Sequence, residues 1–169
     1  GIPTLEEVLR TVAGRVPLLI EVKDQSGNLG PVDGALERAT AQTLEGYQGP
    51  VALMSFNPHS VAVLAAAAPQ LPRGLTTCAF PASEFPQAEG NPAMEARRAA
   101  LAAIAEFDST GSVFISHRWR DLTQPRVAEL KAQGAAILSW TIRSPEEEAI
   151  ARQIAQNITF EHYAPDPSA

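Results

Sequence analysis

The residues best suited to chemistry in this sequence are a carboxylate and an ammonium two positions apart, Glu21 and Lys23, at the end of the apolar stretch 18–23. Side chains alternate along a β-strand, so these two groups lie on one face of it. Charged groups are costly to bury without partners, so an acid and a base at the end of a buried strand predict a functional site. The residues alone leave a structural ion pair open as the alternative.

The elements that position this pair are indicated by five further apolar stretches, each of which runs into polar or aromatic residues. They cover residues 51–56, 74–78, 112–117, 136–141 and 157–161. Segments of helical composition lie between them, and continuous apolar runs that alternate with helices are typical of parallel strands covered on both faces. The sequence therefore predicts an α/β fold, either a barrel or a doubly wound sheet.

Capping signals mark where several predicted helices begin. Thr4 with Glu7 forms a capping box, and Ser144 repeats the pattern with Pro145 at the first helical position and Glu147 three residues on. Further helices are predicted over residues 35–47, 60–68, 92–107 and 125–134, and the longest loop over residues 80–91. The sequence contains no linker, so we expect a single domain over residues 1–169.

Composition excludes two classes of partner. The chain has 169 residues, 45% of them hydrophobic, which is enough to bury a sizeable core. Its 13 basic and 19 acidic side chains give a net charge of −6 without a basic cluster, which argues against nucleic acid and anionic membranes. The longest apolar run, residues 61–68, is too short to span a bilayer. The single cysteine, Cys78, fits a reducing compartment, so a cytoplasmic location is expected, and it is predicted to be a buried strand residue rather than a nucleophile.

Three motifs together closely resemble the glycerophosphodiester phosphodiesterases. They are residues 2–9 leading into residues 19–23, the run Met54-Ser55-Phe56-Asn57-Pro58, and the run Leu138-Ser139-Trp140-Thr141-Ile142. The resemblance spans nearly the whole chain. It departs from the family at residues 157–161, which lack the Thr-Asp of many members, and at Arg143, where many relatives have asparagine.

The resemblance implies a TIM barrel that hydrolyses a small-molecule glycerophosphodiester to sn-glycerol 3-phosphate and an alcohol, using a divalent metal, Mg²⁺ or Ca²⁺. Glu21 matches the last of the family's metal-binding acids, and hard cations of this kind take oxygen ligands. Lys23 matches the family's phosphate-binding lysine, and Trp140 matches its substrate-side tryptophan. Phe56, at the end of the second predicted strand, is a further candidate substrate contact. Active residues of TIM barrels lie at the C-terminal ends of strands, as these do.

The family's N-terminal His-Arg-Gly strand, the Glu and Asp metal ligands after it and its second histidine have no counterpart in this sequence. The pair His117-Arg118 is followed by Trp119 rather than glycine, so no catalytic role is assigned to it, and the family's catalytic histidines would lie upstream. A TIM barrel has eight strands and about 250 residues, whereas six strands are predicted here. We therefore expect a TIM barrel, (β/α)8, of which this chain supplies about six βα units. We expect this chain alone to be inactive, with its open sheet edges covered by an N-terminal segment or by a second copy.

Other functions stay open at this point. One is a non-catalytic remnant of the family that binds a phosphorylated ligand or self-associates, and another is a barrel enzyme related to the phosphoinositide-specific phospholipases, against which the Ser-Phe and Trp-Thr motifs count. The histidines His59, His117 and His162 share no spacing, so no zinc site is predicted.

Overall fold

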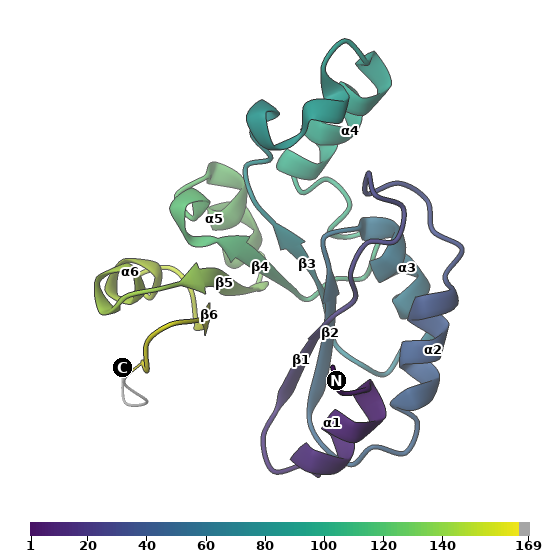
Figure 1. Cartoon of the computed structure of the whole chain (residues 1–169). Coiled ribbons are helices and arrows are strands. Elements are labelled where there is room, and N and C mark those ends of the chain that lie inside the picture. The colour runs from purple at the N-terminus through teal and green to yellow at the C-terminus, as the bar shows by residue number, and fades with distance from the viewer. Residues whose placement is uncertain (166–169) are drawn as a thin grey trace. The chain divides into compact units, whose positions relative to one another are not determined.

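The structure is a computed structural model that describes residues 1–165. Two compact units are present (Figure 1). Unit 1 comprises residues 1–75 and 109–112, and unit 2 comprises residues 76–108 and those from 113 onward. The expectation of a single domain stays a prediction.

Unit 1 contains the helices α1 (Leu5–Val12), α2 (Ala35–Thr43) and α3 (Pro58–Ala67), the strands β1 (Leu18–Glu21) and β2 (Val51–Ser55), and the first part of β3 (Arg73–Thr77). The three strands are parallel, with Glu21 opposite Met54 and Ser55 opposite Leu75. Parallel neighbours require a crossover between them, and the intervening helices provide it.

The apolar core of unit 1 lies between the helices and one face of β1 and β2. Its buried members are Leu9, Val22, Ala41, Leu44, Val51, Leu53, Leu64 and Ala68, with Leu18 and Ile20 packed against them. Because side chains alternate along a strand, Leu19 and Glu21 lie on the opposite face of β1. Leu19 is 38% exposed there, so the charged end of β1 is on the face that points away from this core.

Unit 2 contains the strands β4 (Phe114–Arg118), β5 (Ala136–Ile142) and β6 (Asn157–Phe160), the helices α4 (Pro92–Ala102), α5 (Pro125–Ala132) and α6 (Pro145–Ala151), and the 3-10 turns η1 (Ala82–Glu84), η2 (Pro86–Ala88) and η3 (Trp119–Asp121). The strands β4, β5 and β6 are again parallel, and Arg118 lies opposite Trp140. The strands of each unit follow one another in chain order without the reversal that a doubly wound sheet requires. The predicted α/β class and its six parallel strands are confirmed.

The helix boundaries follow their caps. Thr4 and Glu7 form the predicted capping box at α1. The Ser144 hydroxyl accepts from the Glu147 N–H as predicted, but the Glu147 carboxylate accepts from the Arg143 N–H instead of closing a capping box.

Three predicted boundaries are wrong. Helix α3 begins at Pro58 rather than at residue 60, because Asn57 caps it and proline suits the first helical position. Helices α2 and α4 end at Thr43 and Ala102 rather than at residues 47 and 107, and residues with positive φ, Gly46 and Ile104, follow them. The predicted loop 80–91 contains the turns η1 and η2.

Candidate active site

The acid and the base at the end of β1 are in contact, as their spacing predicts. Lys23 Nζ lies 2.8 Å from Glu21 Oε1, and the Lys23 side chain is 73% exposed against 20% for Glu21. The Glu21 Oε1 atom is itself buried and accepts no well-formed hydrogen bond from the described residues. The partner of this oxygen is thus the Lys23 ammonium, which is itself exposed enough to approach an anion. A carboxylate has several lone pairs, so Glu21 can accept a second cation beside the first.

The loop that follows Lys23 is closed around Asp24. The Asp24 carboxylate accepts hydrogen bonds from Ser26 Oγ at 2.8 Å, from Asn57 Nδ2 at 2.7 Å and from the Leu29 N–H at 3.2 Å. Burial opposes ionisation of this carboxyl, but the hydrogen bonds from Ser26, Asn57 and Leu29 outweigh burial and lower the pKa of Asp24. Asp24 is therefore an ionised structural anchor at the end of the site segment.

The end of β2 contacts the same segment from the neighbouring strand. Ser55 Oγ donates to the Val22 carbonyl oxygen at 2.7 Å, and both Ser55 and Asn57 are fully buried. Phe56 lies between them, so alternation places it on the other face, which Met54 shares with Glu21. Glu21, Lys23 and Phe56 are thus brought to one face of unit 1.

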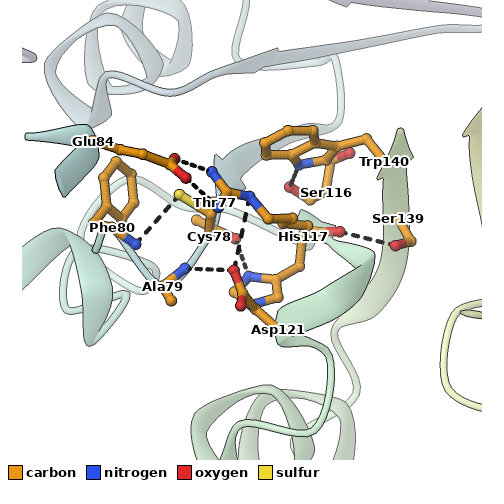
Figure 2. A network of polar contacts seen from close by, with 11 residues as sticks. Thr77, Cys78, Ala79, Phe80, Glu84, Ser116, His117, Asp121, Ser139 and Trp140 are labelled. Atoms are coloured by element: carbon orange, nitrogen blue, oxygen red, sulfur yellow. Dashed lines mark hydrogen bonds and ion pairs between the residues drawn. The ribbon is translucent and has the colours of Figure 1, made fainter. Parts of the chain in front are cut away.

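Trp140 belongs to unit 2 and lies in β5, two residues before its end (Figure 2). Its Nε1–H donates to the Ser116 carbonyl oxygen at 2.8 Å, and its peptide bond to Thr141 is cis. The Arg118 guanidinium lies 5.5 Å from the centroid of the Trp140 ring, within the range of a cation–π contact. The indole is therefore held at both its nitrogen and its face.

Arg118 also contacts the turn η1. It donates from two nitrogens to the two carboxylate oxygens of Glu84, one of these contacts being 2.9 Å long. These hydrogen bonds lower the pKa of Glu84. Arg118 Nε lies 3.8 Å from Asp121 Oδ2, which accepts from the Ala79 N–H at 2.9 Å. The loop 80–91 is thereby tied to the end of β4.

His117 is buried in unit 2 and does not face solvent. Its Nδ1 lies 2.7 Å from Thr77 Oγ1, and the residue has no exposed surface (Figure 2). Burial lowers the pKa of His117 to about 4, although the nearby Asp121 opposes that change. The imidazole is therefore neutral at neutral pH and packed in the core of the unit, which gives it no access to a substrate.

Cys78, on the same segment as Thr77, is a free buried thiol. Burial raises the pKa of Cys78. The hydrogen bond that the Phe80 N–H donates to the Cys78 sulfur opposes this rise but does not cancel it. A thiol that is buried and protonated is a poor nucleophile. Cys78 is therefore buried, as predicted, but it lies one residue beyond the end of β3 rather than within a strand.

The described residues contain no group of three or more His, Cys, Asp or Glu side chains that could hold a metal ion. The metal-binding role of Glu21 stays a prediction. None of the helices in that range combines the length and the apolar composition needed to cross a bilayer.

Residues 1–159 match the glycerophosphoryl diester phosphodiesterase family. The chain belongs to this family. The family is that of phosphoric diester hydrolases, and glycerophosphodiester hydrolysis is its function. No curated protein matches the sequence.

Solved structures of this family share the fold. A phosphodiesterase from Oleispira antarctica, in complex with the product sn-glycerol-3-phosphate, is 17% identical, with a TM-score of 0.67 over 94% of this chain and 57% of that chain. A glycerophosphodiester phosphodiesterase from Parabacteroides distasonis is also 17% identical, with a TM-score of 0.65 over 94% of this chain and 59% of that chain. The chain therefore spans less than two thirds of these relatives, and the prediction of part of a TIM barrel is confirmed.

The sequence indicates the charged candidates Glu21 and Lys23 but not the residues that hold their segment in place. Glu21 and Lys23 were found because their type and spacing are unusual for a strand. The sequence places Ser55 and Asn57 in a family motif, with Ser55 at a strand end, but does not predict their partners. A serine and an asparagine that flank an aromatic residue at a strand end are nevertheless typical of side chains that bond to backbone. Arg118 was set aside with His117, although its register opposite Trp140 makes it the partner of that ring.

Proposed function

We propose that this chain provides the last metal-binding carboxylate, Glu21, and the phosphate-binding lysine, Lys23, of an enzyme that hydrolyses glycerophosphodiesters to sn-glycerol 3-phosphate and an alcohol. The observation that carries the proposal is the contact of the buried Glu21 Oε1 with the exposed Lys23 ammonium at 2.8 Å, which holds an acid and a base together at the end of β1. Family membership over residues 1–159 supports it.

The residues present fit a divalent cation in part. A carboxylate oxygen is the ligand type that Mg²⁺ and Ca²⁺ prefer, and Glu21 can supply one. The chemistry that such a cation contributes when bound is polarisation of the phosphoryl oxygens. The remaining ligands would come from outside the 1–165 range, because no group of three metal-binding side chains occurs within it.

Each of this chain's residues then has a distinct task. The Lys23 ammonium neutralises charge on the phosphate, for which its 73% exposure leaves it accessible. Phe56 offers an aromatic face to the glycerol or to the alcohol group. Trp140 of unit 2 stays a separate candidate for a substrate contact. No histidine of this sequence matches a family catalytic histidine, so proton transfer to the leaving alcohol would depend on groups outside this sequence.

Binding of the product, sn-glycerol 3-phosphate, tests the proposal. In titration calorimetry we expect the wild-type chain to bind it more tightly with Mg²⁺ than without. Lys23→Met should weaken binding about tenfold, because a charge-assisted hydrogen bond to phosphate is lost. Glu21→Gln should abolish the effect of Mg²⁺. The matched controls are Lys131→Met and Glu6→Gln, which alter the same residue types away from β1.

A second candidate function is a non-catalytic phosphate-binding role. It is favoured by the lack of a three-residue metal group within residues 1–165. Its signature is binding of sn-glycerol 3-phosphate that is independent of Mg²⁺ and insensitive to Glu21→Gln but weakened by Lys23→Met. If the wild-type chain and Lys23→Met bind equally, or neither binds, both candidate functions are wrong.

Hydrolysis by the chain alone is a separate measurement. We expect no turnover of a glycerophosphodiester above background with Mg²⁺, because a general acid or base typically contributes about 10² to 10⁴ in rate and neither is assigned in this sequence. Turnover that Glu21→Ala abolishes would show that this chain holds a complete catalytic apparatus.

A further inference from the structure

The end of β2 contains two buried polar side chains whose hydrogen bonds go to the segment that carries Glu21 and Lys23. We propose that Ser55 and Asn57 are positioning residues that fix this segment, and we call the two side chains the Ser55–Asn57 clasp. The inference rests on the proposed function, since it concerns how Glu21 and Lys23 are held for binding.

Ser55 fixes the residue between the acid and the base. The regular pairing of β1 with β2 ends at Glu21 opposite Met54. The next residue, Val22, donates its N–H to the Met54 carbonyl at 2.8 Å and accepts at its carbonyl from Ser55 Oγ at 2.7 Å. Both backbone groups of Val22 are therefore bonded to β2 beyond the regular ladder.

The hydroxyl of Ser55 is held in turn. Besides donating to Val22, Ser55 Oγ accepts from the Asn57 N–H at 3.1 Å, and Ser55 has no exposed surface. A buried hydroxyl that both donates and accepts has its rotamer fixed by both bonds. Through this hydroxyl, β2 fixes the position of the Val22 backbone.

Asn57 fixes the residue that follows the base. Its Nδ2 donates to Asp24 Oδ1 at 2.7 Å and to the Gly30 carbonyl at 2.7 Å, which occupies both amide hydrogens. Its Oδ1 accepts from the His59 N–H at 2.9 Å and caps α3. Because Asp24 directly follows Lys23, the loop 24–30 and the start of α3 are joined at the end of the site segment.

Because side chains alternate along the chain, the residues that hold the segment and the residue that faces the ligand point to opposite sides. Ser55 and Asn57 point to one side and hold the segment, while Phe56 between them lies on the face of Glu21. Small displacements of groups that contact a ligand can cost large factors in binding or rate. The clasp should therefore affect affinity for the ligand beyond its effect on stability.

The test compares Ser55→Ala with Ser60→Ala. Both remove a fully buried serine hydroxyl in unit 1, but the Ser60 hydroxyl donates to Glu37, which takes no part in the clasp. We expect both variants to unfold at lower temperature. Only Ser55→Ala should weaken binding of sn-glycerol 3-phosphate with Mg²⁺, by about tenfold, and Ser55→Thr should restore most of it.

Asn57→Asp provides the second test. It keeps the oxygen that caps α3 but replaces the amide donors with a carboxylate facing Asp24. We expect it to weaken ligand binding at least as much as Ser55→Ala does. The matched control is Asn91→Asp, at the residue that caps α4 through its Oδ1. That variant should bind the ligand like the wild type.

A readout without ligand separates the clasp from the proposed function. NMR order parameters of the backbone amides of Val22, Lys23 and Asp24 should fall in Ser55→Ala and Asn57→Asp and stay unchanged in Ser60→Ala. If the wild-type chain does not bind the product but these parameters fall as expected, the proposed function fails and the positional part of the inference is supported. Order parameters that match the wild type in both clasp variants overturn the inference, as does a loss of affinity that Ser60→Ala shares.

Discussion

At the scale of the residue, the most unusual environment is that of His117. Its ring is bonded to Thr77, lies near Asp121, and has no exposed surface. Burial lowers the pKa of His117 to about 4 from the usual 6.5. The unfolded chain thus binds a proton between these values that the folded chain does not, so acid destabilises the fold.

His117 therefore predicts a pH dependence of stability. Its favourable contribution is complete above pH 6.5 and is lost as the pH falls toward 4, with about 2 kcal/mol lost by pH 5. Urea unfolding at pH 7.5 and 5.0, followed by tryptophan fluorescence, measures it, because Trp119 and Trp140 both belong to unit 2. In His117→Gln the pH difference should shrink by about that amount, whereas His162→Gln, at a residue whose side chain is 76% exposed, should retain it. An equal pH difference in His117→Gln and the wild type would contradict the assignment.

The site residues show what a sequence can predict at this scale. Glu21 and Lys23 could be predicted because alternation along a strand is a local rule. The bonds of Ser55 to Val22 and of Asn57 to Asp24 could not, because each joins residues 33 positions apart that come close only by pairing of β1 with β2. Likewise, the contact of Arg118 with Trp140 follows from the register of two strands.

At the scale of the element, α2 and α3 are joined by a buried polar contact. Glu37 of α2 is 1% exposed, and its carboxylate accepts from the hydroxyl of Ser60 in α3, which has no exposed surface. A buried carboxylate is tolerated only while it is hydrogen-bonded. This pair fixes how the two helices pack.

Removing only the Ser60 hydroxyl should therefore lower the free energy of unfolding more than removing both the hydroxyl and the Glu37 carboxylate. We expect Ser60→Ala to lower the free energy of unfolding by about 1–3 kcal/mol, because the Glu37 carboxylate loses its donor while it stays buried. The double variant Glu37→Met/Ser60→Ala should recover part of that loss. Urea unfolding followed by circular dichroism provides the comparison, with Ser112→Ala, which removes a bond between two neutral hydroxyls, as the milder control. A double variant less stable than Ser60→Ala would show that the carboxylate stabilises the helix pair by another contact.

Some boundaries of helices and strands can be predicted from neighbouring residues and others cannot. The six strands could be predicted because apolar runs with β-branched residues are continuous, and α1 because its capping box is complete. The ends of α2 and α4 could not, because residues compatible with a helix continue past both, Leu44 and Glu45 after α2 and Ala103 to Glu106 after α4. Only the backbone conformations of Gly46 and Ile104 mark the turns that follow.

At the scale of the whole molecule, the strands β1 and β6 each pair with one neighbour only among the described residues. Each also carries an exposed apolar side chain, Leu19 at 38% and Phe160 at 46%. Strands with an unpaired edge tend to associate with other chains. Both units therefore contain a surface suited to self-association.

We expect sedimentation velocity to detect species heavier than 18.0 kDa as the protein concentration rises. Leu19→Lys and Phe160→Lys should shift the distribution toward the monomer, because a charge at an edge strand opposes pairing. Val113→Lys is the control, since Val113 is 54% exposed but does not belong to an edge strand. A chain that sediments as a monomer at every concentration would contradict this prediction.

The burial of Cys78 has a consequence for following unit 2 in solution. It is the sole thiol in the sequence, and both its enclosure and its raised pKa suppress its reaction with electrophiles. A thiol-specific reagent can modify the folded protein only when that part of the unit opens, so the labelling rate measures how often it does so. The chain thus contains a chemical reporter of its own local opening, one that distinguishes a ligand that tightens unit 2 from one that leaves it unchanged.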